Sequence, residues 1–305
     1  MLREVLLTFY SLLIFILTPF LVLLSLLHLN SVKDYPKRLL LKILAAGPVP
    51  QHVAFVMDGN RRYARMLGKG VKHGHGEGYE SLRRVLEICF RLNIRCVSVY
   101  AFAIENFKRS KEEVDALMVL AVDKLDELCR HGDLLNQYNV RLNVIGRTEL
   151  FPSHVKTIVK RAEDLTRMND GSILNICMPY ASTDEITTAI ESCIHDAIED
   201  KVPTTITAEK ITSRLMTTER GSPPRVDILI RTSGVTRLSD FMLWQSNEHT
   251  QIHFVDAFWP DFRLLDFVPI ILQWQRAVWS GRVTPQKPYK SNRRVSRRRL
   301  EVKTE

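Results

Sequence analysis

The chain has 305 residues, 45% of them hydrophobic, and a net charge of +9 from 43 Lys and Arg against 34 Asp and Glu. This length allows one large domain or two ordinary ones, and the composition is that of a globular protein that can bury a sizeable core. The cysteines are odd in number and form no C-x-x-C motif, which excludes a disulfide framework and favours reduced core thiols in a cytosolic catalytic region. They are Cys89, Cys96, Cys129, Cys177 and Cys193.

An apolar segment at residues 5–29 contains no Asp, Glu, Lys or Arg. As a helix it would extend about 37 Å, enough for the roughly 30 Å hydrocarbon core of a bilayer. We therefore expect a membrane helix, or a hairpin if Pro19 breaks it. A cleaved signal peptide or a buried core helix fits so long a run less well. Basic residues are more frequent after the segment than before it, which favours a cytosolic location for the rest of the chain.

The remaining chain alternates short apolar runs with helical patterns, which favours an α/β fold with a mostly parallel central sheet flanked by helices. The helix-breaking cluster AGPVP at 46–50 marks the start of the folded domain. We expect a membrane anchor and juxtamembrane segment in 1–45, a catalytic domain in 46–281 and a basic disordered tail in 282–305. The expected strands are 52–57, 95–102, 140–146, 173–180, 227–232 and 252–256, and the expected helices are 77–92, 111–131, 153–168, 182–198 and 264–279.

Two of the expected helices begin with the pattern of a capping box, in which a serine caps the first turn and a glutamate three residues later bonds back to the serine backbone. The pairs are Ser110 with Glu113 and Ser182 with Glu185. The helix after Ser110 keeps one apolar face over about four turns, from Val114 to Leu128, so we expect it to pack on the sheet.

Polar motifs follow three of the expected strands, at the point where each strand ends. DGNRR follows HVAFVM, ENFKR follows the strand that ends in VYAF, and RTSGVTRLSD follows DILI. Ligands of open parallel sheets bind outside the carboxyl ends of the strands, so we expect the three motifs to meet there. Together they supply Asp58, Arg61, Arg62, Glu105, Asn106, Arg109, Arg231, Arg237 and Ser239.

This set of side chains predicts a site for more than one phosphate group. Guanidinium groups match phosphate oxygens two at a time, and Gly59 and Gly234 would let backbone N–H groups approach a ligand. A helix beginning after DGN would add its positive end. Each arginine alone could form a surface ion pair; five together favour phosphate. Asp58 would repel phosphate unless Mg²⁺ lies between them, and the alternative is that Asp58 caps the following turn.

His75 lies in the glycine-rich stretch GVKHGHGEG at 70–78, which we expect to be a loop before the first helix of the domain. In a loop His75 could bond a phosphate oxygen, carry a proton, or simply be solvated. A zinc site is a poor fit because His73 and His75 have no third ligand nearby in the sequence. The stretch is not a Walker loop, because no G-K-[ST] follows it.

The last 24 residues hold most of the excess charge, because nine basic and two acidic residues between 282 and 305 carry +7 of the +9. Such a block is typically a solvated, disordered end. The alternatives are contact with anionic lipid head groups or with nucleic acid. The nucleic-acid hypothesis rests on the tail alone, and we expect no nucleic-acid partner.

Five motifs in order resemble the cis-prenyltransferase family, also called the undecaprenyl diphosphate synthase family, and most of all its eukaryotic dehydrodolichyl diphosphate synthase catalytic subunits. The resemblance covers roughly residues 46–280. It implies an enzyme that uses Mg²⁺ to extend an allylic diphosphate, such as farnesyl diphosphate, with isopentenyl diphosphate units in cis, for dolichol synthesis and protein glycosylation. The motifs are HVAFVMDGNRRYA, GH at 74–75, YAFAIENFKR, LIRTSGVTRLSDFMLWQ and FWPDF at 258–262.

The resemblance implies roles for individual residues. Asp58 matches the aspartate that handles the metal and the diphosphate, and Asn106 and Arg109 match the motif that supports condensation near the metal. Gly59, Asn60, Arg61, Arg62 and His75 match the allylic diphosphate site, and Arg231, Arg237 and Ser239 match the isopentenyl diphosphate site.

A long apolar product needs a hydrophobic tunnel, and we expect the helices at 77–92 and 111–131 to flank it over the sheet. Their apolar faces fit an ordinary core equally well. An apolar product also accounts for a membrane anchor, so membrane lipid is an expected partner. We expect the endoplasmic reticulum membrane or a lipid droplet as the location, with the catalytic domain facing the cytosol.

The chain departs from single-subunit members of the family in three places. Gln251 stands where they carry an acidic residue, Val71 replaces an arginine, and no R-x-G motif follows Trp279. The resemblance therefore implies a hetero-oligomer with a Nogo-B-receptor-like accessory subunit. The alternative, that the chain is itself the non-catalytic membrane subunit, is disfavoured because it keeps both DGNRR and ENFKR.

Overall fold

The computed structural model describes residues 34–130, 133–199 and 205–287. The apolar segment 5–29 and the basic tail beyond residue 287 lie outside these ranges. Within the described ranges, no helix is long and apolar enough to cross a bilayer. The membrane helix or hairpin expected at 5–29 therefore stays a prediction.

The centre of the fold is a six-stranded sheet with the order β3-β4-β2-β1-β5-β6, in which every neighbouring pair is parallel. This confirms the predicted α/β class. Strand β1 is buried along its whole length, as expected for a strand covered on both faces. The strands are β1 His52–Val56, β2 Cys96–Tyr100, β3 Arg141–Ile145, β4 Ile173–Cys177, β5 Ile228–Arg231 and β6 Gln251–Phe254.

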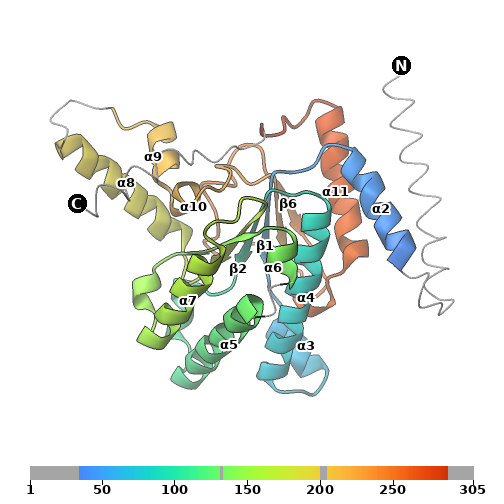
Figure 1. Cartoon of the computed structure of the whole chain (residues 1–305), viewed down its shortest axis with the longest axis horizontal. Coiled ribbons are helices and arrows are strands. Elements are labelled where there is room, and N and C mark those ends of the chain that lie inside the picture. Colours follow the sequence, from blue (N-terminus) through green and yellow to red (C-terminus); the bar gives the residue numbers. More distant parts are fainter. Residues whose placement is uncertain (1–33, 131–132, 200–204, 288–305) are drawn as a thin grey trace.

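Helices surround this sheet (Figure 1). Each helix expected from the sequence is present, and five further α-helices lie in the described residues at 34–46, 60–66, 133–137, 208–214 and 216–219. The helices are α2 Asp34–Ala46, α3 Asn60–Met66, α4 Val71–Arg91, α5 Lys111–Arg130, α6 Asp133–Gln137, α7 Ser153–Thr166, α8 Ser182–Glu199, α9 Ala208–Arg214, α10 Met216–Glu219 and α11 Leu264–Trp279, with 3-10 turns η1 Ile104–Lys108, η2 Thr148–Leu150 and η3 Trp259–Asp261.

The core has two parts because side chains of a strand point alternately to the two faces of a sheet. Phe55 of β1 joins the larger cluster, which includes residues of α2, α4, α7 and α11. Its ring lies 5.8 Å from the rings of Trp259 and Phe267, measured between centroids. Val56 faces the opposite side and joins a smaller cluster with Tyr180 and Phe241. Four of the five cysteines are buried free thiols, as predicted, namely Cys89, Cys96, Cys177 and Cys193.

The glycine-rich stretch at 70–78 is helical, so the prediction of a loop there is wrong. Helix α4 begins at Val71, six residues before the expected start, and runs through the glycines. A Cβ atom on Gly74 would lie 2.2 Å from the backbone oxygen of Asn60, and one on Gly78 would lie 2.3 Å from Asn60 Oδ1. The glycines therefore serve close packing of α4 against α3, and they do not indicate a turn.

The capping box predicted at Ser182 is also wrong, although the helix is present as α8. The Glu185 side chain is fully buried and bonds to groups outside the helix terminus. Asp240 caps the helix instead, accepting hydrogen bonds from the Thr183 backbone N–H at 2.9 Å and from its hydroxyl at 2.6 Å. The donors to Glu185 are Tyr180 Oη, Thr217 N and Oγ1, and Gln245 Nε2.

Segments on both sides of the expected catalytic domain pack on it. Leu44 of α2 is buried, and the side chain of Gln275 on α11 donates to the Leu44 carbonyl oxygen at 2.7 Å. After α11, Gln286 donates to the Arg225 carbonyl oxygen at 2.7 Å. The fold therefore includes residues beyond both ends of the best-matched motifs.

Candidate active site

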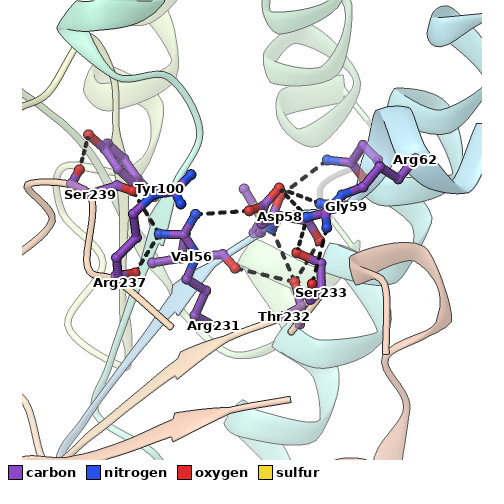
Figure 2. A network of polar contacts seen from close by, with 12 residues as sticks. Val56, Asp58, Gly59, Arg62, Tyr100, Arg231, Thr232, Ser233, Arg237 and Ser239 are labelled. Carbon is purple, nitrogen blue, oxygen red and sulfur yellow. Dashed lines mark hydrogen bonds and ion pairs between the residues drawn. The ribbon is translucent and has the colours of Figure 1, made fainter. Parts of the chain in front are cut away.

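The three polar motifs meet at one edge of the sheet, as predicted. Strands β2, β1 and β5 are neighbours, and in their register Val56 lies opposite both Tyr100 and Arg231. The chain therefore leaves the three strands at nearly the same level, and the side chains that follow converge (Figure 2). All eleven predicted site residues line one cavity of about 750 Å³, namely Asp58, Gly59, Asn60, Arg61, Arg62, His75, Asn106, Arg109, Arg231, Arg237 and Ser239.

Asp58 is the acidic centre of this edge. Its Oδ2 atom accepts a hydrogen bond from Arg231 Nη2 at 2.9 Å, and its Oδ1 atom accepts one from the Gly59 N–H at 2.7 Å. Arg62 Nη2 lies 3.4 Å from Oδ1. Burial alone would raise the pKa of Asp58, but the bond and charge of Arg231, the Gly59 N–H and the charge of Arg62 together lower it. The carboxylate is therefore ionised at neutral pH.

The backbone around Asp58 is fixed by its neighbours. The Thr232 hydroxyl donates to the Asp58 carbonyl oxygen at 2.7 Å and accepts from the Asp58 N–H at 3.1 Å. Gly59 has φ +106°, and a Cβ there would lie 2.8 Å from the Phe258 ring and 3.1 Å from Ser233 Cβ. Only glycine fits this position without strain. The turn between β1 and α3 therefore sets the direction in which Asp58 points.

Arg62 is held beside Asp58 by Ser233, a residue that sequence reasoning missed. The guanidinium donates to the Ser233 carbonyl oxygen at 3.2 Å and to its hydroxyl, and it lies over the Phe258 ring at 5.6 Å from the centroid. Ser233 adopts φ +76°, a conformation that few side chains other than glycine accept. No sequence signal marked this position, because the contact joins residues 171 apart in the chain.

Arg61 and Arg109 share one carboxylate, that of Glu113 on α5. Glu113 Oε1 lies 2.8 Å from Arg109 Nη1 and 3.3 Å from Arg61 Nη1. The sequence indicated Glu113 only as part of a capping box. Half of that box forms, since the Glu113 N–H donates to Ser110 Oγ at 3.3 Å, while the carboxylate orients the two arginines.

His75 reaches the cavity from α4. Burial lowers the pKa of His75, and the nearby positive charges of Arg109 and Arg61 lower it further, against an opposing effect of Glu113. Its Nε2 atom is buried and has no hydrogen-bond partner in the described structure. A neutral imidazole with one unused ring nitrogen beside two guanidinium groups is suited to bond a ligand oxygen.

Asn106 stabilises the turn between β2 and α5. Its Oδ1 atom accepts from the Ala103 N–H at 3.1 Å, closing the η1 turn on which the ENFKR motif lies. The side chain also lines the cavity. Asn106 therefore stabilises the backbone of the turn through its side-chain oxygen and also contributes to the wall of the cavity.

Arg231 connects Asp58 to the segment that carries Arg237 and Ser239. It is 4% exposed, and its Nη1 atom donates to Ser239 Oγ at 2.7 Å and to the Arg237 carbonyl oxygen. Tyr100, a second residue that sequence reasoning missed, has its hydroxyl 3.2 Å from the carbonyl oxygens of both Ser239 and Tyr180 and donates to this pair of acceptors. The aromatic ring at the end of strand β2 could have signalled this role, but aromatic residues are common in any strand.

The rest of the cavity lining is mostly apolar apart from Lys124, and it comes largely from α4 and α5, the two helices expected to flank a tunnel. Ile176 of β4 also lines it, as do Phe102 and Met178, which follow strands β2 and β4. The helices contribute Tyr79 and Leu82 from α4 and Leu117, Leu120, Ala121 and Leu125 from α5. The site therefore joins a strongly cationic head to an apolar space.

The donor set fits a magnesium ion bound in the presence of phosphate. Asp58 is the only Asp or Glu among the described residues that line the cavity. An ionised carboxylate offers about four lone-pair positions, and its three N–H neighbours leave room for a cation. The described residues contain no cluster of three or more His, Cys, Asp or Glu side chains suited to a metal. Magnesium, however, is commonly held by one or two carboxylates together with substrate phosphates and waters.

Fold and site together define a class of enzyme. Arginine side chains at the carboxyl edge of a parallel sheet line a cavity that is otherwise mostly apolar, an arrangement suited to a diphosphate that carries a hydrocarbon chain. Residues 56–279 match the prenyltransferase family model described as undecaprenyl diphosphate synthase. The chain belongs to this family.

Similar proteins agree with this assignment. The chain is 42% identical over 243 residues to a dehydrodolichyl diphosphate synthase complex subunit of Schizosaccharomyces pombe, covering 79% of this chain and 91% of that one. It is 41% identical over 248 residues to the geranylgeranyl-diphosphate-specific tritrans,polycis-undecaprenyl-diphosphate synthase of Thermococcus kodakarensis, covering 81% and 92%. Lavandulyl diphosphate synthase from Lavandula x intermedia, solved with dimethylallyl diphosphate, superposes with a TM-score of 0.70 at 28% identity, covering 74% and 95%.

Proposed function

We propose that the chain is the catalytic subunit of a cis-polyprenyl diphosphate synthase, which condenses isopentenyl diphosphate units onto an allylic primer such as farnesyl diphosphate. The product is a long-chain polyprenyl diphosphate of the dehydrodolichyl type, used for dolichol synthesis and protein glycosylation. One observation carries the proposal: six arginines and one ionised carboxylate form the head of a cavity whose remaining wall is mostly apolar. The name of the Schizosaccharomyces pombe relative supports it.

The allylic diphosphate binds at Gly59, Asn60, Arg61, Arg62 and His75. Breaking its carbon–oxygen bond moves negative charge onto the leaving diphosphate, and fixed guanidinium groups stabilise that charge. Glu113 holds Arg61 and Arg109 in place, and Ser233 holds Arg62, so the groups need little rearrangement. Asp58 would hold Mg²⁺, which supplies further charge neutralisation at the diphosphate when bound.

Isopentenyl diphosphate binds at Arg231, Arg237 and Ser239, on the other side of Asp58. The hydrogen bonds of Arg231 and Tyr100 fix the Ser239 segment, so the second substrate is held within reach of the allylic carbon. Its double bond attacks that carbon as the diphosphate leaves, and a new carbon–carbon bond forms. The proton lost from C2 of the isopentenyl unit passes to an oxygen of the released diphosphate. The hydrocarbon chain then extends along the apolar cavity between α4 and α5.

The chain works with an accessory subunit of the Nogo-B-receptor type at a membrane. The absence of an R-x-G motif after Trp279 supports this, as does the description of the Schizosaccharomyces pombe relative as a complex subunit. An apolar product and the uncharged segment 5–29 support a location at the endoplasmic reticulum membrane or a lipid droplet. The catalytic domain then faces the cytosol.

The test is incorporation of radiolabelled isopentenyl diphosphate into lipid, with farnesyl diphosphate and Mg²⁺, in the presence and absence of the accessory subunit. We expect elongated lipid only when the accessory subunit is present, and none after chelation of the metal. Undiminished elongation by an Arg62→Ala, Arg231→Ala chain together with the partner would contradict the proposal. In that case the chemistry would belong to another subunit.

A further inference from the structure

The segment from Ser239 to Leu243 has a backbone conformation that most side chains avoid. Ser239, Asp240 and Met242 have φ values of +53°, +58° and +48°, in the left-handed region. Residues with a Cβ atom enter this region at a cost in energy, and several of them in one segment persist only when surrounding contacts hold them there. Ser239 is one of the residues proposed to bind isopentenyl diphosphate. The contacts that hold this segment therefore determine where Ser239 lies.

Two residues of the segment are held from the side of the candidate active site. Arg231 Nη1 donates to the Ser239 hydroxyl at 2.7 Å, and the Tyr100 hydroxyl lies 3.2 Å from the Ser239 carbonyl oxygen (Figure 2). The Phe241 ring is 0% exposed and stacks on the Tyr100 ring, with the centroids 4.6 Å apart. Asp240 lies between these two anchored residues, and its side chain contacts a different element.

Asp240 joins the segment to the first turn of helix α8. Its Oδ1 and Oδ2 atoms accept from the Thr183 N–H at 2.9 Å and from the Thr183 hydroxyl at 2.6 Å. Its carbonyl oxygen accepts from the Ser182 N–H at 2.8 Å, and Ser182 Oγ accepts from the Leu243 N–H at 2.9 Å. Four hydrogen bonds therefore connect the segment to two residues of α8.

The capping of α8 alone does not account for this arrangement. A carboxylate is a favoured cap at a helix N-terminus, and the bonds from the N–H groups of Ser182 and Thr183 fit that role. The bond from the Leu243 N–H to Ser182 Oγ, however, satisfies no helix donor and fixes the backbone on the far side of Phe241. Aspartate is also among the few residues with a side chain that tolerate the left-handed region. Position 240 therefore uses both properties of aspartate.

We propose that Asp240 is a positioning residue for isopentenyl diphosphate in the reaction proposed above, on which this inference rests. The described residues that line the cavity include Ser239 and Arg237 but not Asp240, so Asp240 acts through its neighbours and not on the substrate. Its bonds to α8 keep Ser239 in the strained conformation that places it beside Arg231. Without them the segment relaxes and the second diphosphate site loses its shape, while the allylic site on α3 and α4 is unaffected.

The test is the KM for each substrate in Asp240 variants of the full chain with its accessory subunit. Asp240→Gly still permits the left-handed conformation but removes both side-chain bonds, and Asp240→Ala removes both properties. For each we expect the KM for isopentenyl diphosphate to rise about tenfold, with an unchanged KM for the allylic primer. Asp240→Asn keeps an acceptor for the Thr183 N–H and an amide that can donate to the Thr183 hydroxyl. We expect its KM values to stay close to those of the wild type.

Thr207→Ala is the matched control, because it removes a helix cap elsewhere. Thr207 caps α9 by accepting from the Lys210 N–H at 3.3 Å and is not among the described residues that line the cavity. This variant should lower the melting temperature and leave both KM values unchanged. If Asp240 only stabilises α8, Asp240→Gly will behave in the same way, and the proposal is overturned. Equal changes in the two KM values would also overturn it.

A milder variant keeps the test decisive if the Asp240 variants do not fold. Thr183→Val removes only the hydroxyl donor to Oδ2, and we expect a smaller rise in the KM for isopentenyl diphosphate alone; no rise would overturn the proposal. If the unaltered complex makes no elongated lipid, the proposed function itself fails, and that outcome is seen before any variant is compared.

Discussion

His52 makes the stability of the fold depend on pH at the amino-terminal end of strand β1, away from the candidate active site. Its ring is 0% exposed, and burial lowers its pKa to about 4, although bonds to the carbonyl groups of Arg225 and Pro223 act in the opposite direction. Nδ1 lies 3.1 Å from the Arg225 carbonyl oxygen and therefore donates, so Nε2, 2.7 Å from Ser98 Oγ, accepts the serine hydroxyl. Ser98 Oγ in turn accepts from Asn175 Nδ2 at 2.9 Å. Protonation of His52 would leave that hydroxyl without its acceptor and bury a positive charge.

The direction in which pH changes the stability follows from comparing the pKa of His52 in the folded and unfolded states. The unfolded histidine has its ordinary value of 6.5 and the folded one about 4, so below pH 6.5 the unfolded state binds more protons and stability falls. For these two values the loss is about 2 kcal/mol at pH 5 and approaches roughly 3 kcal/mol below pH 4. Above pH 7 the contribution of His52 to the free energy of unfolding no longer changes with pH.

Urea unfolding followed by tryptophan fluorescence at pH 7.5 and at pH 5 measures this loss. His52→Gln provides the comparison, because glutamine offers a donor and an acceptor but does not titrate. Asp227 accepts from the His52 backbone N–H at 3.0 Å, and burial raises its pKa despite its hydrogen bonds; its effect on stability therefore has the opposite sign. Asp227 is present in both wild type and His52→Gln, so its effect cancels when the losses of stability of the two proteins between the two pH values are subtracted. An equal loss of stability in wild type and variant between the two pH values would refute the reasoning.

Three further substitutions test the candidate site. Asp58→Asn keeps the shape of the side chain but removes the charge that Arg231 and Arg62 compensate, and we expect a loss of elongation of at least about 100-fold with an unchanged circular dichroism spectrum. Gly59→Ala adds a Cβ at φ +106° and 2.8 Å from the Phe258 ring, and chemical denaturation should show a loss of about 1–3 kcal/mol. Tyr100→Phe removes the bond to the Ser239 carbonyl oxygen; steady-state kinetics should show a several-fold higher KM for isopentenyl diphosphate and an unaltered KM for the allylic primer, whereas equal changes in both would contradict the role given to the Ser239 segment.

The sheet and its ligand-binding edge could be predicted because both depend on local pattern. A continuous apolar run such as HVAFV can be satisfied only by a strand buried on both faces, and a polar motif directly after it must then lie at the carboxyl edge. The meeting of Asp58 with Arg231 followed from this rule, although 173 residues separate them. The boundaries of α11 were equally readable, because its apolar face is continuous from Leu264 to Trp279.

Residues whose roles depend on a distant neighbour could not be found in this way. Gly74 looks like a loop residue until the backbone of Asn60 is placed against it. Glu185 matches a capping pattern, but Tyr180, Thr217 and Gln245 offer it stronger partners in the core. Ser233 carries no local signal, since its carbonyl oxygen and hydroxyl accept from Arg62 and its N–H donates to the carbonyl oxygen of Ala257, both distant in the sequence. In each case the deciding contact joins segments that local sequence cannot bring together.

The distribution of charge in the site links its geometry to its chemistry. Six guanidinium groups line the cavity, and two nearby carboxylates are each shared between two of them: Asp58 between Arg231 and Arg62, and Glu113 between Arg109 and Arg61. Two negative charges therefore face six positive ones. The shared carboxylates hold the guanidinium groups in position without neutralising them. The remaining positive charge suits polyanionic ligands. In the proposed reaction two diphosphates would bind in one turnover, and the residues proposed to hold them adjoin at Asp58.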